Sequence, residues 1–399
     1  MKKIIILIAV CLMLCGCKEA PEEVKENMKE YGENEQIKEE TQLSYCKPDE
    51  LKNADIKDID VKESSIKLPE NIDFSEVSDV ELLKIKLGDN YIDNNIGRLA
   101  ELFGVSEEKF EETKSYLSGR YVVGRDEQLR KEVGIIDHGF VAYIAGTQFT
   151  DDDNQEPDLE NIEDIENIEM YSGPELAAVY HEETDDFSSI DIPFENGNEK
   201  LSVMCEKAEK FYKDNFVYDS KVDYRITDAA VFDNGHLSLN GEWFYKGISF
   251  NDHLIYATDG DEYDFAFCNN GETNYDDKDL MSLFVIHNFQ FTIEETEKPD
   301  KIIDFKSAVS LVNNKFASFN NLRIDEVVPL YFVLAHCKPG TDAEAPGTVY
   351  EARPVYAFLT KKKMELSTED YLNVSGYDRF ITVDMITGEI LTNYENYAD

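Results

Sequence analysis

Two acidic residues near the end of the chain are close enough in sequence to share a ligand. Asp384 and Glu389 lie in the stretch FITVDMITGEIL, residues 380–391, and a carboxylate pair can bind a hard cation or act as general acid and base. The stretch also has the chemistry of a turn. Gly388 tolerates a positive φ, and Asp384 can accept hydrogen bonds from the amides that follow it. We therefore predict a turn between two strands.

Histidines are the next residues that could bind a metal. The sequence YHEETDD contains His181, Glu182 and Glu183, but a zinc hydrolase of the His-Glu-x-x-His type needs a second imidazole four residues after the first. None follows, and the 6 histidines of the chain are scattered. We expect them in turns and on sheet surfaces, and we predict no metal site and no cofactor.

The cysteines lack the neighbours that a nucleophile requires. A reactive thiol needs a base beside it, and on a strand the adjacent His336 and Cys337 would point to opposite faces. Cys205 lies on the apolar face of a predicted helix, so we expect it in the core. Together with Cys46 and Cys268 these cysteines are widely spaced, which leaves open whether they form disulfides or remain buried thiols.

Acidic loops contain the densest groups of oxygen ligands. They are the stretches TDDDNQEPD at 150–158 and TDGDEYD at 258–264. Neither has the EF-hand register, which places glycine at the sixth position and glutamate at the twelfth. We expect solvated acidic loops, and weak calcium binding remains the alternative.

Aromatic residues next to acidic ones suggest a sugar-binding platform with a carboxylate pair. The candidates are Trp243, Tyr245 and Tyr263. Trp243 and Tyr245 alternate along a predicted strand, however, and that pattern is typical of cross-strand packing. The chain also lacks a Gly-x-Ser-x-Gly elbow, a P-loop and a dinucleotide-binding glycine pattern, so we predict no catalytic residue.

The charge of the chain limits its partners. It contains 84 Asp and Glu against 39 Lys and Arg, a formal net charge of −45. Such a surface repels nucleic acid and anionic lipid, and no basic stripe offsets the repulsion. The composition therefore excludes nucleic-acid binding.

The first residues have the pattern of an export signal. Two lysines precede an apolar run from Ile4 to Leu14, which is shorter than the ~20 residues of a transmembrane helix. The sequence LCGC that follows, ending at Cys17, resembles the bacterial lipobox. This resemblance implies that residues 1–16 are removed and that Cys17 carries the lipid. An ordinary secretory signal is the alternative.

A lipid on Cys17 would place the protein on the extracytoplasmic face of a bacterial cell membrane. Cleavage would remove Lys2 and Lys3 and lower the net charge by two, from −45 to −47. Residues 17–43 are almost wholly polar and charged, so we expect them to form an acidic tether.

Beyond the tether we predict an α+β protein with three folded regions. Residues 44–195 are expected to form an irregular α+β domain, with one helix from Asp93 to Phe103, a second beginning at Ser106, and strands in RYVVG, KEVGIIDHGFVAYIAGTQF and ELAAVYHEE. Two helix-on-antiparallel-sheet modules are expected to follow, at 196–298 and 299–399.

Both modules are predicted from one amphipathic helix followed by alternating strands. Apolar residues recur at helical spacing from Leu201 to Tyr212 and again from Phe305 to Phe319. Strand patterns follow each helix, including HLSLNGEWFYKGISF in the first module and VYEARPVYAFLT in the second. A helix packed on one face of a sheet buries both apolar surfaces.

The last hundred residues, about 300–399, resemble the PepSY-like modules of exported Gram-positive proteins and the YycH/YycI-type regulators. The likeness rests on the helix FKSAVSLVNNKF, the strand YEARPVYAFL and the closing VDMITGEIL. A tryptophan often follows the proline in these families, where this chain has Val355 and Tyr356. As a whole the chain resembles uncharacterised lipoproteins of Clostridia. The resemblance implies a helix packed on a sheet and regulatory or inhibitory contacts with another protein.

These observations lead us to expect a non-enzymatic, lipid-anchored protein that acts by binding an envelope protein. Two alternatives remain open. A solute-binding lipoprotein of a transporter would need a preformed pocket between lobes, and a cell-wall hydrolase would need converging carboxylates in a cleft.

Overall fold

Antiparallel strands dominate the fold. The computed structural model describes residues 43–54, 66–87, 90–113, 120–136, 140–146, 176–182, 185–216, 219–233, 235–250, 270–286, 291–317, 322–335, 349–361 and 377–392. They all belong to one compact unit of the chain, Leu43–Phe149 with Ser172–Asp399. The predicted α+β class is confirmed, with many more strands than helices.

One succession of elements, a helix followed by four antiparallel strands, occurs three times. The first consists of α3 (Tyr91–Phe103), β4 (Phe110–Thr113), β5 (Tyr121–Asp126), β6 (Lys131–Ile136) and β7 (Phe140–Ala145). The second consists of α4 (Leu201–Phe216), β11 (Asp223–Phe232), β12 (Leu237–Tyr245), β14 (Asn270–Asp277) and β15 (Leu280–Ile286). The third consists of α5 (Phe305–Lys315), β19 (Glu326–Ala335), β20 (Val349–Lys361), β21 (Tyr377–Asp384) and β22 (Ile390–Thr392).

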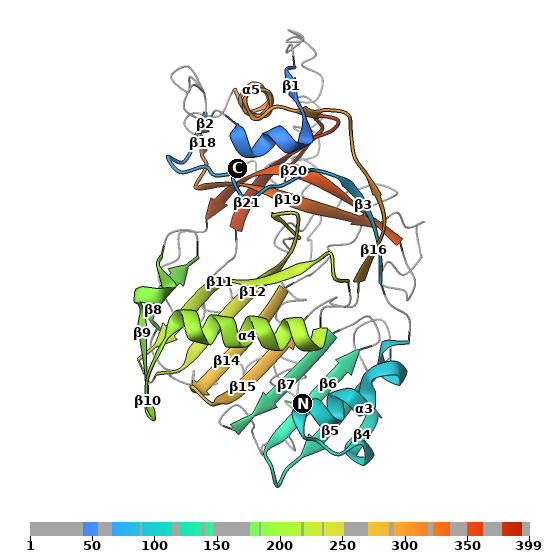
Figure 1. Ribbon diagram of the computed structural model, residues 1–399, viewed down its shortest axis with the longest axis vertical. Coiled ribbons are helices and arrows are strands. Elements are labelled where there is room, and N and C mark those ends of the chain that lie inside the picture. The colour runs from blue at the N-terminus through green and yellow to red at the C-terminus, as the bar shows by residue number, and fades with distance from the viewer. Residues whose placement is uncertain are drawn as a thin grey trace, which may run out of the picture. The chain divides into compact units, whose positions relative to one another are not determined.

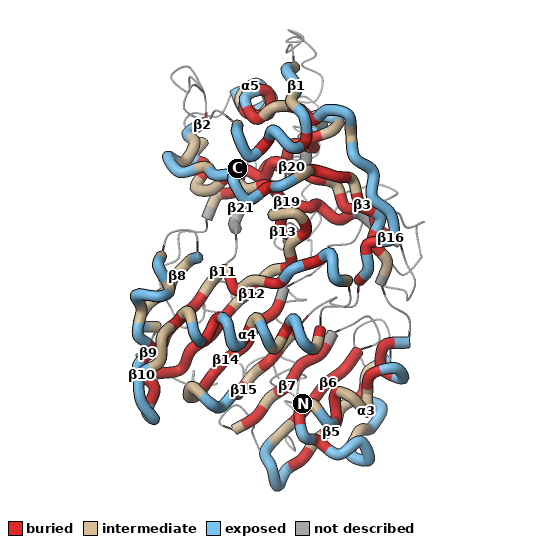
Figure 2. Tube along the Cα trace, in the orientation of Figure 1, coloured by how far each residue is buried: buried red, intermediate tan, exposed pale blue. Residues whose placement is uncertain are grey.

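The first two sets of strands join edge to edge. Strand β7 pairs with β15, and β8 (Leu176–His181) adds a further strand beside β11. Helices α3 and α4 pack against this sheet (Figure 1). The ring of Phe284 on β15 contacts Phe103 of α3 and Phe211 of α4, with centroid distances of 5.6 and 5.3 Å. Both helices therefore pack on one apolar core. Figure 2 shows the buried stretches of the strands in red.

Helix α5 packs on the third set of strands. The side chain of Asp304 caps its first turn by accepting a hydrogen bond from the amide of Ser307 at 2.7 Å. The ring of Phe305 stacks on Phe358 of β20 at 6.0 Å and meets Phe74 edge-on at 5.1 Å. An N-terminal residue thus completes the core beneath the last helix.

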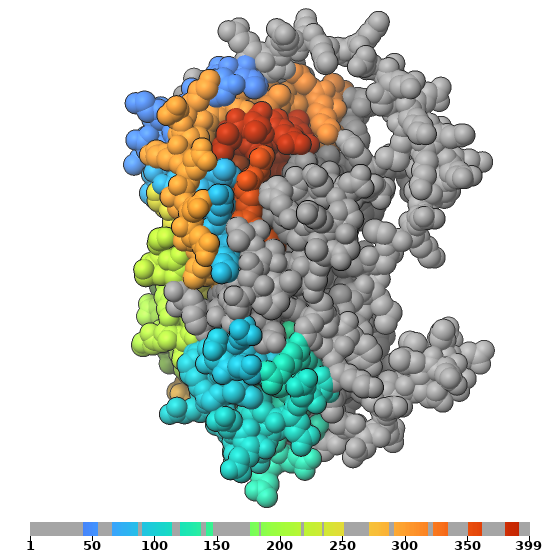
Figure 3. All heavy atoms as spheres, turned by 90° about the vertical axis from the view of Figure 1, so that its right-hand side faces the viewer, coloured from blue at the N-terminus to red at the C-terminus, as the bar shows by residue number. Residues whose placement is uncertain are grey.

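Strand pairing crosses the boundaries of the three regions that we expected. Strand β20 pairs with β21 along one half and with β3 along the other, and β3 pairs in turn with β16. In Figure 3 the blue atoms of β1 and its neighbours lie against the orange segment that contains β17, its partner strand. The strands concerned are β1 (Tyr45–Cys46), β3 (Leu82–Leu87), β16 (Phe291–Glu297) and β17 (Ile302–Ile303).

The region that we expected to be irregular contains the first helix-plus-strands succession. Its helix is present as α3, but Ser106 begins only a 3-10 turn, Glu107–Lys109. The chain enters β4 directly afterwards, and the ring of Phe110 packs over Gly124 of β5, where a Cβ would have no room. At Ser106, pairing of the following residues in β4 therefore overrides the helix start that a good N-cap residue favours.

One short strand links the sheet under α3 and α4 to the sheet under α5. Strand β13 (Ile248–Ser249) pairs with β12 on one side and, at a single position, Ser249 beside Leu330, with β19 on the other. The ring of Phe250 then stacks on Tyr331 of β19 at 4.9 Å.

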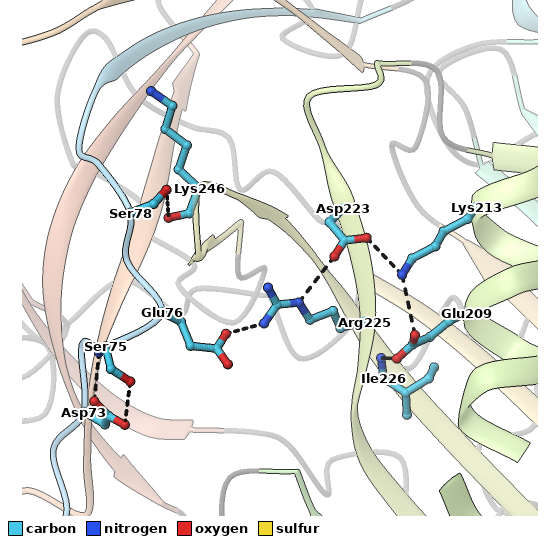
Figure 4. A network of polar contacts seen from close by, with 10 residues as sticks. All are labelled: Asp73, Ser75, Glu76, Ser78, Glu209, Lys213, Asp223, Arg225, Ile226 and Lys246. Carbon is cyan, nitrogen blue, oxygen red and sulfur yellow. Dashed lines mark hydrogen bonds and ion pairs between the residues drawn. The ribbon is translucent and has the colours of Figure 1, made fainter. Parts of the chain in front are cut away.

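The turn before β13 is held by the segment that leads into β3. Lys246 and Gly247 both have positive φ, 55° and 82°. The amide of Ser78 donates to the carbonyl of Lys246 at 3.0 Å, and the Ser78 hydroxyl donates to the same carbonyl at 3.4 Å (Figure 4). Lys246 Nζ donates to Glu81 Oε1 at 2.6 Å. Tyr245 donates its hydroxyl hydrogen to the other oxygen of Glu81 at 2.7 Å.

Replacing Lys246 with methionine is expected to lower the free energy of unfolding by about 2 kcal/mol at neutral pH, because Glu81 then keeps a buried charge without its partner. Burial raises the pKa of Glu81, but hydrogen bonds from Lys246 and Tyr245 outweigh burial and hold this pKa below its usual value. A lowered pKa stabilises the fold above the unfolded-state pKa, and this stabilisation is lost as the pH falls through the folded-state pKa. The penalty should therefore shrink near pH 4.

Urea unfolding of both proteins at pH 7 and at pH 4 measures this difference. Lys298→Met is the matched control, since Lys298 is 49% exposed and pairs with Asp79 at 2.8 Å; its loss should cost less than about 1 kcal/mol. Equal penalties for Lys246→Met at both pH values would contradict the assignment.

Candidate functional site

The acidic pair near the end of the chain forms a turn, as we predicted. Asp384 Oδ1 accepts hydrogen bonds from the amides of Ile386 and Thr387 at 2.7 and 2.8 Å. Its other oxygen accepts from Arg353 Nη1 at 2.9 Å. Gly388 has a φ of 77°. Asp384 is thus fully engaged in holding the connection from β21 to β22.

The aromatic residues proposed for a sugar platform are in the core. Trp243 is 1% exposed and packs against Tyr224 at 4.8 Å. Tyr245 is also buried, so neither ring presents a face to a sugar. Tyr263 lies outside the described residues.

Cys46 and Cys205 are free thiols. Burial, followed by the charges of Glu209 and Glu182, raises the pKa of Cys205 far above its ordinary value. A thiol with such a pKa stays protonated at neutral pH and is a poor nucleophile, which agrees with the core position we expected.

Several predicted features lie outside the described residues. They are Cys17, Cys268, His336, Cys337 and the acidic stretches at 150–158 and 258–264. Within the described part of the chain, no group of three or more His, Cys, Asp or Glu side chains is placed to hold a metal ion. Among the helices described there, none is long and apolar enough to cross a membrane.

His181 does lie in a polar cluster, at the end of β8. Its Nδ1 hydrogen-bonds to Asp228 on the neighbouring strand β11, and Asp228 also accepts from the hydroxyl of Thr227 at 2.8 Å. A carboxylate on Nδ1 fixes the orientation of the imidazole. His181 therefore lies on a sheet surface, as we expected for the histidines. Its carboxylate partner, Asp228, is distant in the sequence and could not be found from local spacing.

A second group of charged residues joins β11 to α4 and to the segment before β3 (Figure 4). Arg225 bonds to Glu76 and lies 3.4 Å from Asp223. Lys213 of α4 joins Asp223 and Glu209 at 2.9 and 3.5 Å. The cations are therefore shared, each between two carboxylates.

Glu182 lies near several of these charged residues. Burial raises its pKa, the charge of Arg225 opposes this, and Glu209 and Glu76 raise the pKa further. The net shift is upward, and burial is its largest cause.

The outer edge of β8 lies beside this cluster. Among the described strands it pairs with β11 alone. The amide of Glu182 donates to the carbonyl of Thr227 at 2.8 Å, and hydrogen-bonding residues alternate along an antiparallel strand. The backbone groups of Tyr180 therefore face β11, whereas the N–H and C=O of Val179 point away from it.

Among the described residues, Asp185 covers one end of this outer edge. The outward N–H of His181 donates to Asp185 Oδ2 and its carbonyl accepts from the amide of Asp185, both at 2.9 Å. No described residue covers Val179 in this way. The part of the edge that the described residues leave uncovered thus begins two residues before the end of the strand.

Two other edge strands, β4 and β16, carry the charges that normally prevent pairing. Glu111 and Glu112 are exposed on β4, and β16 exposes Glu294, Glu295 and Glu297. Strand β8 reads LAAVYH, without a charged residue before its final histidine. Of these three edges, β8 is the one suited to accept another strand.

No protein-family model matches the chain, and no curated protein matches it. Among solved structures, it is similar to an uncharacterized protein from Eubacterium rectale, with a TM-score of 0.50 and 13% sequence identity over 82% of this chain and 90% of the other. At this identity the similarity concerns the fold alone.

Proposed function

We propose that the chain is a lipid-anchored envelope protein that acts by binding another protein through the edge of β8. The observation that carries the proposal is an uncharged strand with an outward-facing backbone at Val179. An extended segment of a partner can hydrogen-bond to such an edge and continue the sheet. The lipobox-like sequence ending at Cys17 supports attachment to the extracytoplasmic face of the membrane.

The C-terminal resemblance supports a regulatory role. Helix α5 and strands β19 to β22 correspond to the region that resembles PepSY-like and YycH/YycI-type modules, and those families imply inhibitory or regulatory contacts. A partner held at β8 would be an envelope protein such as a sensor, a protease or a transporter subunit. No catalysis by the chain itself enters this proposal.

Replacing Val179 with proline is expected to reduce capture of the partner at least tenfold. Proline removes the outward N–H of residue 179, and no hydrogen bond to β11 is lost because that amide does not face β11. The measurement is crosslinking in native membranes followed by affinity purification of the tethered protein. Quantitative mass spectrometry then compares the variant with the wild type.

Val179→Lys tests the same edge by a different route, since a lysine on an edge strand opposes pairing. Leu280→Lys is the matched control. Leu280 is 42% exposed at the start of β15. Strands β14, β12 and β11 separate β15 from β8 in the sheet. Equal loss of capture in both lysine variants, or full capture by Val179→Pro, would contradict the proposal.

A further inference from the structure

The first two sets of a helix and four strands join symmetrically. Across their common sheet the strands lie in the order β4-β5-β6-β7-β15-β14-β12-β11, so each set meets the other through its fourth strand. Strands β7 and β15 run antiparallel, and α3 and α4 both contact the ring of Phe284. An approximate two-fold rotation normal to the sheet therefore exchanges the two sets, as it exchanges two subunits across an isologous interface.

Strand β22 is the fourth strand of the third set, and among the described strands it pairs with β21 alone. The amide of Asp384 donates to the carbonyl of Glu389 at 2.9 Å, and the residues that bond to one neighbour alternate along an antiparallel strand. The backbone groups of Leu391 therefore face β21. Those of Ile390 and Thr392 point away from it and form an outer edge.

The three fourth strands share an uncharged sequence. Strand β7 reads FVAYIA, β15 reads LMSLFVI and β22 reads ILT. The edge strands β4 and β16 instead contain glutamates, which oppose pairing with another strand. Strand β22 thus has the composition of the two strands that join one set to another.

We propose that two copies of the chain associate through their β22 strands, which pair antiparallel about a two-fold axis. Within one chain the fourth strands of the first two sets occupy one another, so the matching partner for β22 is β22 of a second copy. Pairing centred on Leu391 places Ile390 of each copy opposite Thr392 of the other, and their outward backbone groups can then exchange hydrogen bonds. In this register Glu389, the charged residue before the strand, does not lie opposite its own copy.

The charge of the chain sets the salt dependence of this dimer. Each copy carries a net charge of −45, so two copies repel one another at long range. Added salt screens that repulsion and leaves the backbone hydrogen bonds in place. Because a short strand buries little area, and small interfaces are weak, we expect a dimer that exchanges with the monomer at micromolar concentration and becomes several-fold tighter at high salt.

Sedimentation velocity of the mature full-length protein in detergent tests the inference. Thr392→Pro should raise the dissociation constant of the dimer at least tenfold, because proline removes an outward N–H and no hydrogen bond to β21. Val179→Pro is the matched control, since it alters the edge of β8 in the same way and should leave the dimer unchanged. A monomer at every concentration and salt, a dimer that Thr392→Pro leaves intact, or a dimer lost in Val179→Pro would overturn the inference.

Disulfide trapping gives a second measurement, which does not depend on the folding of a proline variant. Opposite residues that exchange no hydrogen bonds have Cα atoms about 4.5 Å apart in an antiparallel pair, and a disulfide can span that distance. Leu391→Cys in native membranes, oxidised by air with copper–phenanthroline, should therefore form covalent dimers at least tenfold faster than Ala177→Cys, whose site on β8 is exposed. The wild type gives the background from the native cysteines. Equal rates in the two variants would contradict pairing through β22, whatever partner is captured at β8.

Discussion

Replacing Gly247 with alanine is expected to lower the free energy of unfolding by about 3–5 kcal/mol, the range of strong steric and backbone effects. Gly247 has a φ of 82°, a conformation that side chains disfavour, and a Cβ there would overlap the carbonyl oxygen of Glu76 and lie 2.6 Å from its carbonyl carbon. Neither backbone can move freely, because the amide of Ser78 is bonded to Lys246. Urea unfolding followed by circular dichroism measures the loss.

Gly146→Ala separates the two causes. Gly146 has a φ of 59°, but the nearest atom to its Cβ would be a side-chain carbon of Leu280 at 3.6 Å. Only the conformational penalty applies, so the cost should be about 1 kcal/mol. A loss at Gly247 no larger than that at Gly146 would show that the turn before β13 is not tightly packed against the segment at Glu76.

Replacing Phe284 with alanine is expected to cost about 3–5 kcal/mol, as for other buried phenylalanines. Its side chain is 0% exposed. Its ring contacts Phe103 on α3 at 5.6 Å and Phe216 on α4 at 4.8 Å. The cavity left by the ring therefore weakens the packing of both helices on the sheet. A helix that moved to fill the cavity would lose its contacts with the other helix.

Leu280→Ala on the same strand is the control for Phe284→Ala. Leu280 is 42% exposed, so the change should stay within about 0.5 kcal/mol. We expect Phe284→Ala to unfold in one transition at lower urea, because α3 and α4 share its core. Loss of only one helix, seen as a separate early transition, would contradict a shared core.

Local patterns predicted the elements but not their partners. The helical periodicities identified α4 and α5, and alternation identified β12 and β20, because these signals lie within one stretch of sequence. Strand β3 pairs with β20 and β16, which are more than two hundred residues away. Such pairings are fixed by which apolar faces are buried together, and no local pattern contains that information.

The same limit applies to the candidate site. The stretch from Leu176 to His181 was predicted as a strand. The sequence also shows that this stretch contains no Asp, Glu, Lys or Arg, although glutamates flank it on both sides. That it is an edge, and that Asp228 and Glu209 lie beside it, follows only from its pairing with β11 and the packing of α4. The turn at Asp384 was predictable because all of its hydrogen bonds to the turn amides are local.

The most direct test of a binding edge at β8 is site-specific photocrosslinking in the native membrane. A photoreactive phenylalanine analogue is placed at Val179 in one tethered protein and at Glu112, on the charged edge of β4, in another. We predict a discrete crosslinked protein partner from position 179 and none from position 112. Crosslinks of equal yield from both positions, or none from position 179 while position 112 captures a protein, would contradict the account.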